Sequence, residues 1–201
     1  MRRTLSAALL VGAALAMTAC TTTRLLSTWK APNVNTISFT KVLAAAVSSN
    51  PATRRAAEEM MVREIGPERA VASYTIIPDA EIQDAEKAKA RVKAAGIDGA
   101  VVLRLLGIDQ EVTYVPGSYS YTPYYGSFYG YWGHSWPAVY EPGYLRTDTV
   151  VKIETLIYSI KDDALLWAAT SESVSPSGVD QLIGDLAKAL SSKLRSEKLI
   201  P

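Results

Sequence analysis

Strand-like and helix-like segments alternate between residues 39 and 114, and this alternation constrains the fold more than any other feature of the sequence. Residues 39–47 are apolar at odd and even positions alike, which is typical of a buried strand. Helical periodicity follows from Pro51, with Asn50 in the position of an N-cap, and it stops at Gly66. The first unit of the chain is therefore predicted to be a strand followed by a helix.

The same order repeats downstream. Residues 71–77 are predicted to form a strand and residues 80–95 a helix, for which Gly96 supplies the C-cap. The strongest strand signal of the chain follows at 100–106 and continues with partial alternation to Tyr114. Strands separated by helices normally lie parallel and are joined by right-handed crossovers.

The second half of the chain has a different pattern. Residues 147–160 and 165–174 alternate in hydropathy around a turn at 161–164, which predicts an antiparallel hairpin. A final helix begins near Val179 and carries a continuous apolar stripe, which we interpret as core. We therefore predict an α/β fold, a single-domain sandwich over residues 38–197. Three parallel strands from a β-α-β-α-β unit would be extended by the C-terminal hairpin, with three helices covering the sheet.

The N-terminus predicts export. Arg2 and Arg3 precede an apolar stretch from Leu5 to Met17, and small residues lead to Cys20, the only cysteine of the chain. This stretch is too short to span a bilayer stably. An ordinary cleaved signal with an incidental thiol, or a short N-terminal anchor, would be the alternatives.

The residues before Cys20 resemble a bacterial lipobox, although Met17 stands where leucine is usual. The resemblance implies a signal peptide at 1–19 and diacylation (palmitate) of Cys20, which would anchor the protein durably to a lipid bilayer. Thr21 follows where an aspartate would signal inner-membrane retention. In a Gram-negative host we therefore expect the outer membrane, at its periplasmic face. Residues 20–37 show no sustained periodicity and are predicted to be a tether.

Charge argues against nucleic acid as a partner. The chain has 21 Lys and Arg residues against 20 Asp and Glu residues, and removal of residues 1–19 leaves 19 basic side chains. Binding to a polyanion requires a clustered basic excess, which this sequence lacks.

The sequence also gives little support for enzyme activity. His134 is the only histidine, and a triad built with the adjacent Ser135 would need two sequence neighbours to face each other. One histidine is too few for an ordinary zinc site. The acid pairs are predicted to lie on solvated surfaces: Glu58 and Glu59 on a helix, Asp162 and Asp163 on a turn. We therefore expect no enzyme activity, no metal and no cofactor.

Residues 116–145 form a Tyr/Gly-rich insert that holds eight of the eleven tyrosines and a single charged residue, Glu141. A long insert inside a compact domain is normally functional or disordered. Three interpretations remain open: a partly disordered loop folded back on the sheet, a recognition surface for an envelope protein or glycan, and insertion into a membrane interface. The candidate binding residues are Tyr121, Tyr124, Tyr125, Tyr129, Tyr131, Trp132 and Trp136.

Two local patterns carry a resemblance to known proteins. One is a G-x-D turn that enters a strand ending in an Arg-Leu pair, and the other is a turn followed by Leu-Leu-Trp. The matching residues are Gly96, Asp98, Arg104, Leu105, Asp162, Asp163, Leu165, Leu166 and Trp167. On these residues the chain resembles uncharacterised bacterial envelope lipoproteins of the domain-of-unknown-function type.

At the level of fold alone, the alternation also resembles the α/β domain of the curli-secretion lipoprotein and the N-terminal domain of the Tol-system propeller protein. A likeness at the level of fold does not transfer function. From the sequence we expect a non-enzymatic envelope lipoprotein that binds or scaffolds another envelope component, with the aromatic insert as the contact. The alternative is a subunit of an oligomeric outer-membrane export or assembly apparatus, although the insert is broken by prolines and lacks the sustained alternation of transmembrane strands.

Overall fold

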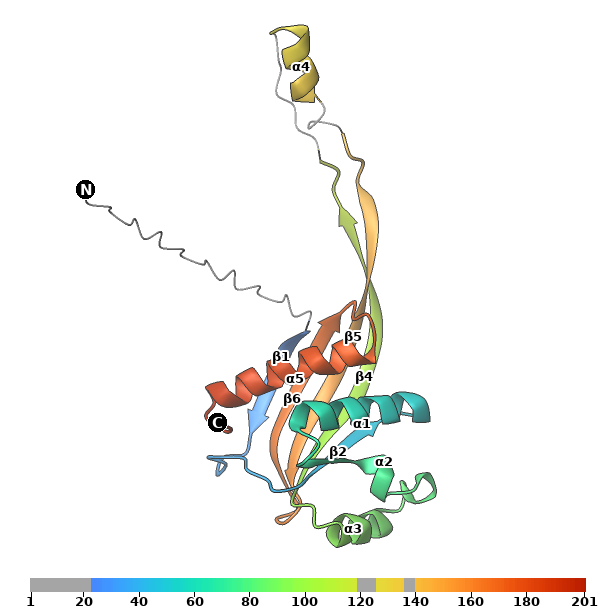
Figure 1. Cartoon of the computed structure of the whole chain (residues 1–201), viewed down its shortest axis with the longest axis vertical. Helices are drawn as coiled ribbons and strands as arrows, with labels where there is room; N and C mark the ends of the chain where they lie inside the picture. The colour runs from blue at the N-terminus through green and yellow to red at the C-terminus, as the bar shows by residue number, and fades with distance from the viewer. Residues whose placement is uncertain (1–22, 119–125, 136–139) are drawn as a thin grey trace, which may run out of the picture.

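The computed structural model describes residues 23–118, 126–135 and 140–201, which form a mixed α/β fold around one six-stranded sheet in the order β1-β6-β5-β4-β2-β3 (Figure 1). The strands are β1 (Thr23–Lys30), β2 (Val42–Val47), β3 (Ala70–Ala72), β4 (Gly99–Val115), β5 (Tyr144–Ser159) and β6 (Ala164–Val174). The helices are α1 (Pro51–Ile65), α2 (Ser73–Ile76), α3 (Ala85–Ala94), α4 (Phe128–Ser135) and α5 (Val179–Ser196), with a 3₁₀ turn at Asp79–Glu81.

The pairing of the strands confirms the predicted combination of a parallel unit and an antiparallel hairpin, but the described residues form six strands instead of five and five helices instead of three. β2 lies parallel to β3 and to β4, whereas β4, β5, β6 and β1 pair antiparallel in succession. The prediction of a tether is wrong for residues 23–30, because they form β1 and pair with β6. Their side chains show little periodicity since most of this edge strand is exposed on both faces.

The local signals around α1 are confirmed. Asn50 Oδ1 accepts hydrogen bonds from the backbone N–H groups of Ala52 and Thr53, and Pro51 occupies the first helical position. The helix ends at Gly66, whose φ of +116° is a conformation that few other residues adopt. Gly96 plays the corresponding part after α3, with a φ of +68°.

The prediction that Glu58 is solvated, with Arg54 also pointing outward, is wrong. Glu58 is fully buried, and its Oε1 accepts hydrogen bonds from Arg54 Nε at 3.0 Å and from the backbone N–H of Ala46 at 3.1 Å. Ser73 Oγ donates to the same oxygen at 2.6 Å. A buried carboxylate is tolerated when every lone pair is matched in this way, and helical periodicity alone cannot reveal such partners.

The same carboxylate explains a second difference from the expected fold. The predicted strand at 71–77 is reduced to the three residues of β3, after which the chain turns into the short helix α2. This turn brings Ser73 Oγ and the backbone N–H of Tyr74 to the two oxygens of Glu58. The buried carboxylate of Glu58 requires hydrogen-bond donors, and the turn that supplies them replaces the strand that local propensity favours.

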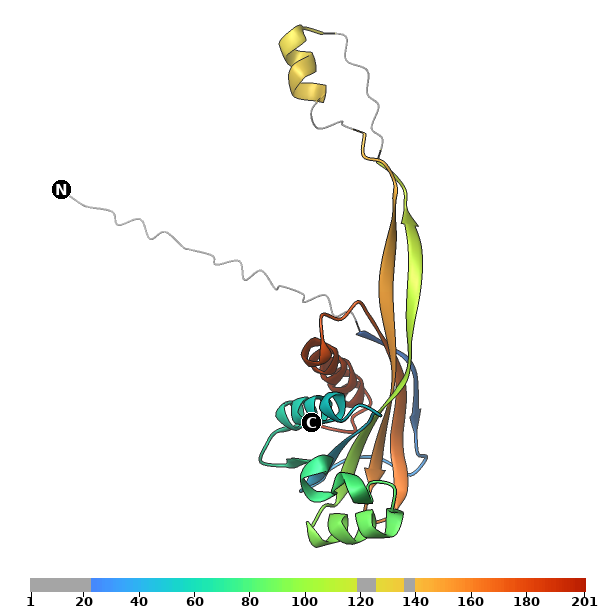
Figure 2. The ribbon, with the colours of Figure 1, turned by 90° about the vertical axis from the view of Figure 1, so that its right-hand side faces the viewer.

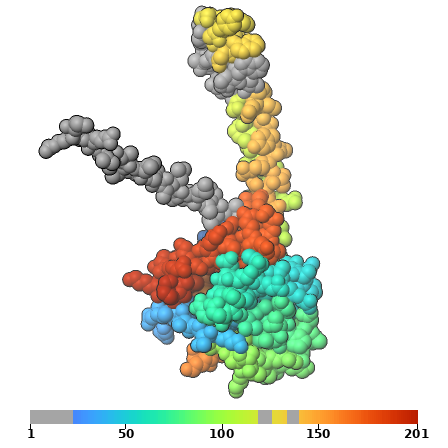
Figure 3. Space-filling model, in the orientation of Figure 1, coloured from blue at the N-terminus to red at the C-terminus, as the bar shows by residue number. Residues whose placement is uncertain are grey.

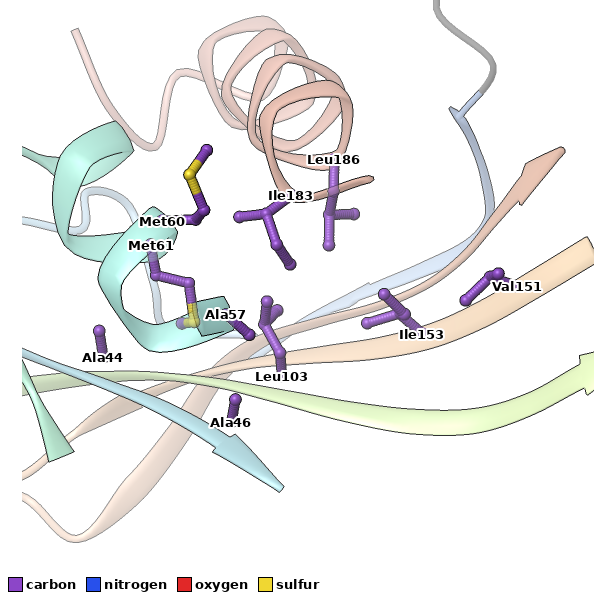
Figure 4. Close-up of a cluster of buried hydrophobic side chains, with 10 residues drawn as sticks. All are labelled: Ala44, Ala46, Ala57, Met60, Met61, Leu103, Val151, Ile153, Ile183 and Leu186. Atoms are coloured by element: carbon purple, nitrogen blue, oxygen red, sulfur yellow. The ribbon is translucent and has the colours of Figure 1, made fainter. Parts of the chain in front are cut away.

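Helices cover the two faces of the sheet unequally (Figure 2). α1 and α5 pack on one face, where Met61, Leu103, Ile183 and Leu186 point toward one another in the main core cluster (Figure 4). α3 covers only one end of the opposite face, over the cross-strand row Leu43, Ala100 and Tyr158. The apolar stripe of α5 is thus core, as predicted.

Candidate functional site: a protruding amphipathic hairpin

β4 and β5 extend far beyond the strands beside them. β4 pairs with β2 only as far as Arg104, and β5 pairs with β6 only from Val150 onward. Outside these limits the two strands continue as a two-stranded ribbon that ends at the pair Val115 and Tyr144. Six residue pairs at about 3.4 Å per residue give a length of roughly 20 Å. Figure 3 shows this ribbon as a narrow arm that leaves the body.

One face of the ribbon is exposed and carries most of its apolar side chains, together with the polar pair Gln110 and Thr149. Ile108, Val112 and Tyr114 lie opposite Val151, Thr147 and Leu145, and directly paired residues point to the same side of a sheet. Val151 belongs to the core cluster beneath α1 and α5, so this face continues the helix-covered face of the body. The exposed fractions of the apolar residues are 60% for Ile108, 62% for Val112, 63% for Tyr114 and 69% for Leu145.

The other face of the ribbon is charged. Lys152 Nζ lies 2.8 Å from Asp109 Oδ2, and Arg146 Nε lies 2.8 Å from Asp148 Oδ2. The hydrogen bond to Asp109, followed by the attraction between the two charges, raises the pKa of Lys152. Glu111 pairs in register with Asp148 on this same face. The ribbon is therefore amphipathic: its charged face is readily solvated, whereas exposure of its apolar side chains to water is unfavourable.

α4 lies at the far end of the hairpin (Figure 1), and half of its eight residues are Phe, Tyr or Trp: Phe128, Tyr129, Tyr131 and Trp132. The ring of Phe128 contacts those of Tyr129 and Trp132, with centroids 5.3 Å and 5.9 Å apart. Tyr129 is 84% exposed, and Phe128, Tyr131, Trp132 and Tyr140 are also exposed. The tip thus presents a compact set of amphipathic rings.

The predicted binding residues fall into two groups. Tyr129, Tyr131 and Trp132 lie on α4 and are exposed, as a contact surface requires. The others lie outside the described residues, and so does the lipidation site. They are Tyr121, Tyr124, Tyr125, Trp136 and Cys20.

Sequence reasoning missed the apolar face of the ribbon. Ile108, Val112 and Tyr114 were recognised as strand residues, but their alternation was interpreted as part of the packed sheet. A signal was present: the alternation in β4 continues well beyond the six residues of β2, its partner strand. Where a strand extends beyond its neighbours and beyond the helices that pack on the sheet, its apolar face remains uncovered.

The first residue of β1 lies close to the root of the hairpin. β1 begins at Thr23, which pairs with Ser173 at the end of the sheet from which the ribbon leaves. The two side-chain hydroxyls are 2.6 Å apart.

Within the described part of the chain, no group of three or more His, Cys, Asp or Glu side chains is arranged to hold a metal ion. None of the helices described is long and apolar enough to cross a membrane. His134 and Ser135 lie on α4, in the part of it whose side chains are not described.

No protein-family model and no curated protein matches the chain. Among solved structures, it is similar to the PelC dodecamer from Paraburkholderia phytofirmans, with 13% identity over 82% of this chain and 94% of that one, at a TM-score of 0.44. A point variant of that dodecamer gives 15% identity over 84% and 94%, at 0.43. Lipoprotein GNA1162 from Neisseria meningitidis gives 12% identity over 78% and 98%, at 0.40. Likeness this remote does not transfer function.

Proposed function

We propose that this protein is a non-enzymatic envelope lipoprotein, tethered to a bilayer through acylated Cys20, which binds another envelope component with its protruding hairpin. The contact surface consists of the apolar face of the ribbon and the aromatic rings at its tip. The observation that carries the proposal is the exposure of Ile108, Val112, Tyr114 and Leu145 on the same face of the hairpin.

Energetics support a partner for this face. A two-stranded ribbon is only marginally stable in water by itself, because it has no layer against which to bury its apolar side chains. The body has such a layer in α1 and α5, which end before the ribbon begins (Figure 2). Contiguous apolar surface rimmed by charge is characteristic of interaction sites. Burial against a partner would supply the missing layer.

The position of the anchor supports a partner at the membrane. Thr23 lies at the end of the sheet from which the ribbon leaves, and Cys20 precedes it by three residues in the sequence, so acylation of Cys20 would hold this end near the headgroups. A ribbon of roughly 20 Å then reaches a component at or within the bilayer interface. Tyrosine and tryptophan are the side chains best suited to that depth.

Site-specific photocrosslinking in cells tests the proposal. A photoreactive residue at Val112 faces the apolar side, and the same residue at Glu111 faces the charged side of the same strand. We expect a discrete adduct with one other envelope component from position 112 and little from position 111. Equal yields from the two positions, or no adduct from either, would contradict a contact through the apolar face.

A second candidate function is a subunit of an oligomeric export or assembly apparatus. The observation that favours it is that the ribbon leaves both of its outer edges without a paired strand beyond Arg104 on β4 and before Val150 on β5. Unpaired strand edges are templates for further strands, including those of identical copies. A ladder of self-adducts from positions 111 and 112 together would identify this function in place of the first.

A further inference from the structure

The helix-covered side of the body contains a cavity that the hairpin function does not use. Its volume is about 610 Å³, and it lies between α1, α5 and the strands beneath them. This is within the usual range for small-molecule sites, roughly 300–1,000 Å³. An engineered apolar cavity of about 150 Å³ is already large enough to bind benzene. The space between the helices is therefore sufficient for a ligand.

The cavity is lined by residues of two clusters of the hydrophobic core. Met61, Leu103 and Ile183 line it from the main cluster, whereas Ile157 and Leu194 line it from the cluster around Trp167. An empty space here deprives all these side chains of contacts that close packing would give them. A long apolar occupant would restore a continuous core.

The floor of the cavity holds an unpaired polar atom. Thr155, on β5, is fully buried and lines the cavity, and its Oγ1 has no hydrogen-bond partner. A buried hydroxyl without a hydrogen-bond partner destabilises the fold, because it has lost its hydrogen bonds to water. The occupant of this cavity is therefore expected to bring an oxygen to Thr155.

The rim of the cavity differs from its floor. The exposed lining residues are Thr36, Ser38, Glu64, Arg69, Arg195 and Pro201. Arg69 Nη2 donates to the carbonyl oxygen of Ile65, and Arg195 Nε donates to the carbonyl oxygen of Pro201. A guanidinium has five N–H donors, so both retain donors for an anionic group at the mouth.

We propose that this cavity binds a single fatty acyl chain, with an anionic headgroup at the arginine-bearing mouth and an oxygen on the chain at Thr155. The apolar walls exclude a sugar or a nucleotide, which would leave many polar groups without partners. The site is independent of the hairpin, and each can exist without the other.

Photolabelling of the complete, lipidated protein in its own membranes tests this site. The probe is palmitic acid with a diazirine in its chain, and the readout is the yield of labelled peptides from α5 relative to those from α3. We expect α5 to dominate and unlabelled palmitate to compete. Equal labelling of the two helices would overturn the proposal.

Two adjacent serines on α5 supply a matched pair of variants. Ser191 lines the cavity, whereas Ser192 is exposed and does not. Ser191→Trp fills the cavity and should lower α5 labelling by about tenfold, equivalent to 1.4 kcal/mol of binding free energy. Ser192→Trp should leave it unchanged. Thermal melts show whether both variants are folded, and equal labelling in two folded variants would refute a cavity site.

The contact with Thr155 and the source of the acyl chain are tested separately. Hydroxypalmitates that carry the hydroxyl at different carbons serve as competitors, and at least one should compete better than palmitate in the native protein but not in Thr155→Val. If none does, the oxygen contact is wrong. A diazirine-labelled lysophosphatidylglycerol distinguishes the two sources of the acyl chain. It should label α5 if the occupant is a membrane lipid, and it should not label α5 if the occupant is a free fatty acid.

Discussion

The body and the ribbon are built from the same two strands, yet they use the same alternating pattern differently. In the body, Leu103 on β4 is 6% exposed and Ile153 on β5 is 5% exposed, because α1 and α5 lie over them. In the ribbon, Val112 and Leu145 occupy the same face of the same strands and are more than 60% exposed. Alternation therefore specifies that a strand has an apolar face. Whether that face is core or contact surface depends on what covers it.

The polar groups of the two regions differ in the same way. In the body, the charges of Arg54 and Glu58 are buried and each has several partners. In the ribbon, the pair of Arg146 and Asp148 lies at the surface, where an ion pair contributes little. Mutations should therefore be costly to folding in the body and costly to binding in the ribbon.

Replacement of one aromatic residue in each region should give the largest contrast in stability. Trp167 is fully buried and its Nε1 donates to Glu197 Oε2 at 3.0 Å, whereas Tyr129 is 84% exposed. Trp167→Ala should lower the free energy of unfolding by about 3–5 kcal/mol. Tyr129→Ala should change it by less than about 0.5 kcal/mol. Chemical denaturation measures both, and a similar loss in the two variants would remove the distinction between regions.

The buried carboxylate offers a second contrast, this time within α1. Glu58→Gln places an amide among donors that require an acceptor and should cost about 2–3 kcal/mol. The adjacent Glu59 is exposed and accepts a hydrogen bond from the hydroxyl of Tyr74. Glu59→Gln should be close to neutral. If urea titrations found equal stability for the two variants, the network around Glu58 would have no structural role.

Asp98 should make the folding stability of the body depend on pH. Burial favours a higher pKa for this carboxyl, but the backbone N–H groups of Thr40 and Lys41 donate to it at 2.8 Å and 2.9 Å and lower the pKa below the usual 3.8. The carboxylate therefore stabilises the fold above pH 3.8, and this contribution is lost as the pH falls through the lowered pKa.

Asp98→Asn should accordingly cost about 1–2 kcal/mol near neutral pH and less in acid. Thermal melts between pH 7 and pH 2.5 measure the difference between the variant and the native protein. A difference that stayed constant over this range would show that ionisation of Asp98 does not contribute.

The smallest effect on folding is expected in the ribbon itself. Val112→Thr keeps the shape and the strand propensity of the side chain but makes the apolar face more polar. The free energy of unfolding should change by less than about 0.5 kcal/mol. Crosslinking from the neighbouring apolar position Tyr114 should nevertheless fall clearly if this face contacts a partner. An unaltered adduct yield would place the contact at the aromatic tip instead.

Much of the fold could be predicted from local signals. The cap of α1 by Asn50, the stop at Gly66 and the stripe of α5 depend on contacts a few residues apart, and all three were confirmed. The edge strand β1 could not be predicted, because an exposed strand needs no alternation and its partner, β6, lies about 150 residues later.

The candidate site could be predicted only in part. The concentration of aromatic residues near Tyr129 and Trp132 is visible in the sequence, and both side chains are exposed. The cavity at Thr155 is different in kind, because it depends on how far apart α1 and α5 lie above β5. Spacing between helices is a property of packing and leaves no pattern in any one segment.

The sequence by itself determined which segments are strands or helices at most positions, and which face of each is apolar, because these properties follow from backbone period and side-chain polarity. Tertiary structure alone decided that β4 and β5 outrun their neighbours, that Glu58 is buried with its donors, and that one apolar face is packed while its continuation is exposed. The physical reason is that burial depends on which other segments arrive at a surface, and those segments are distant in the chain.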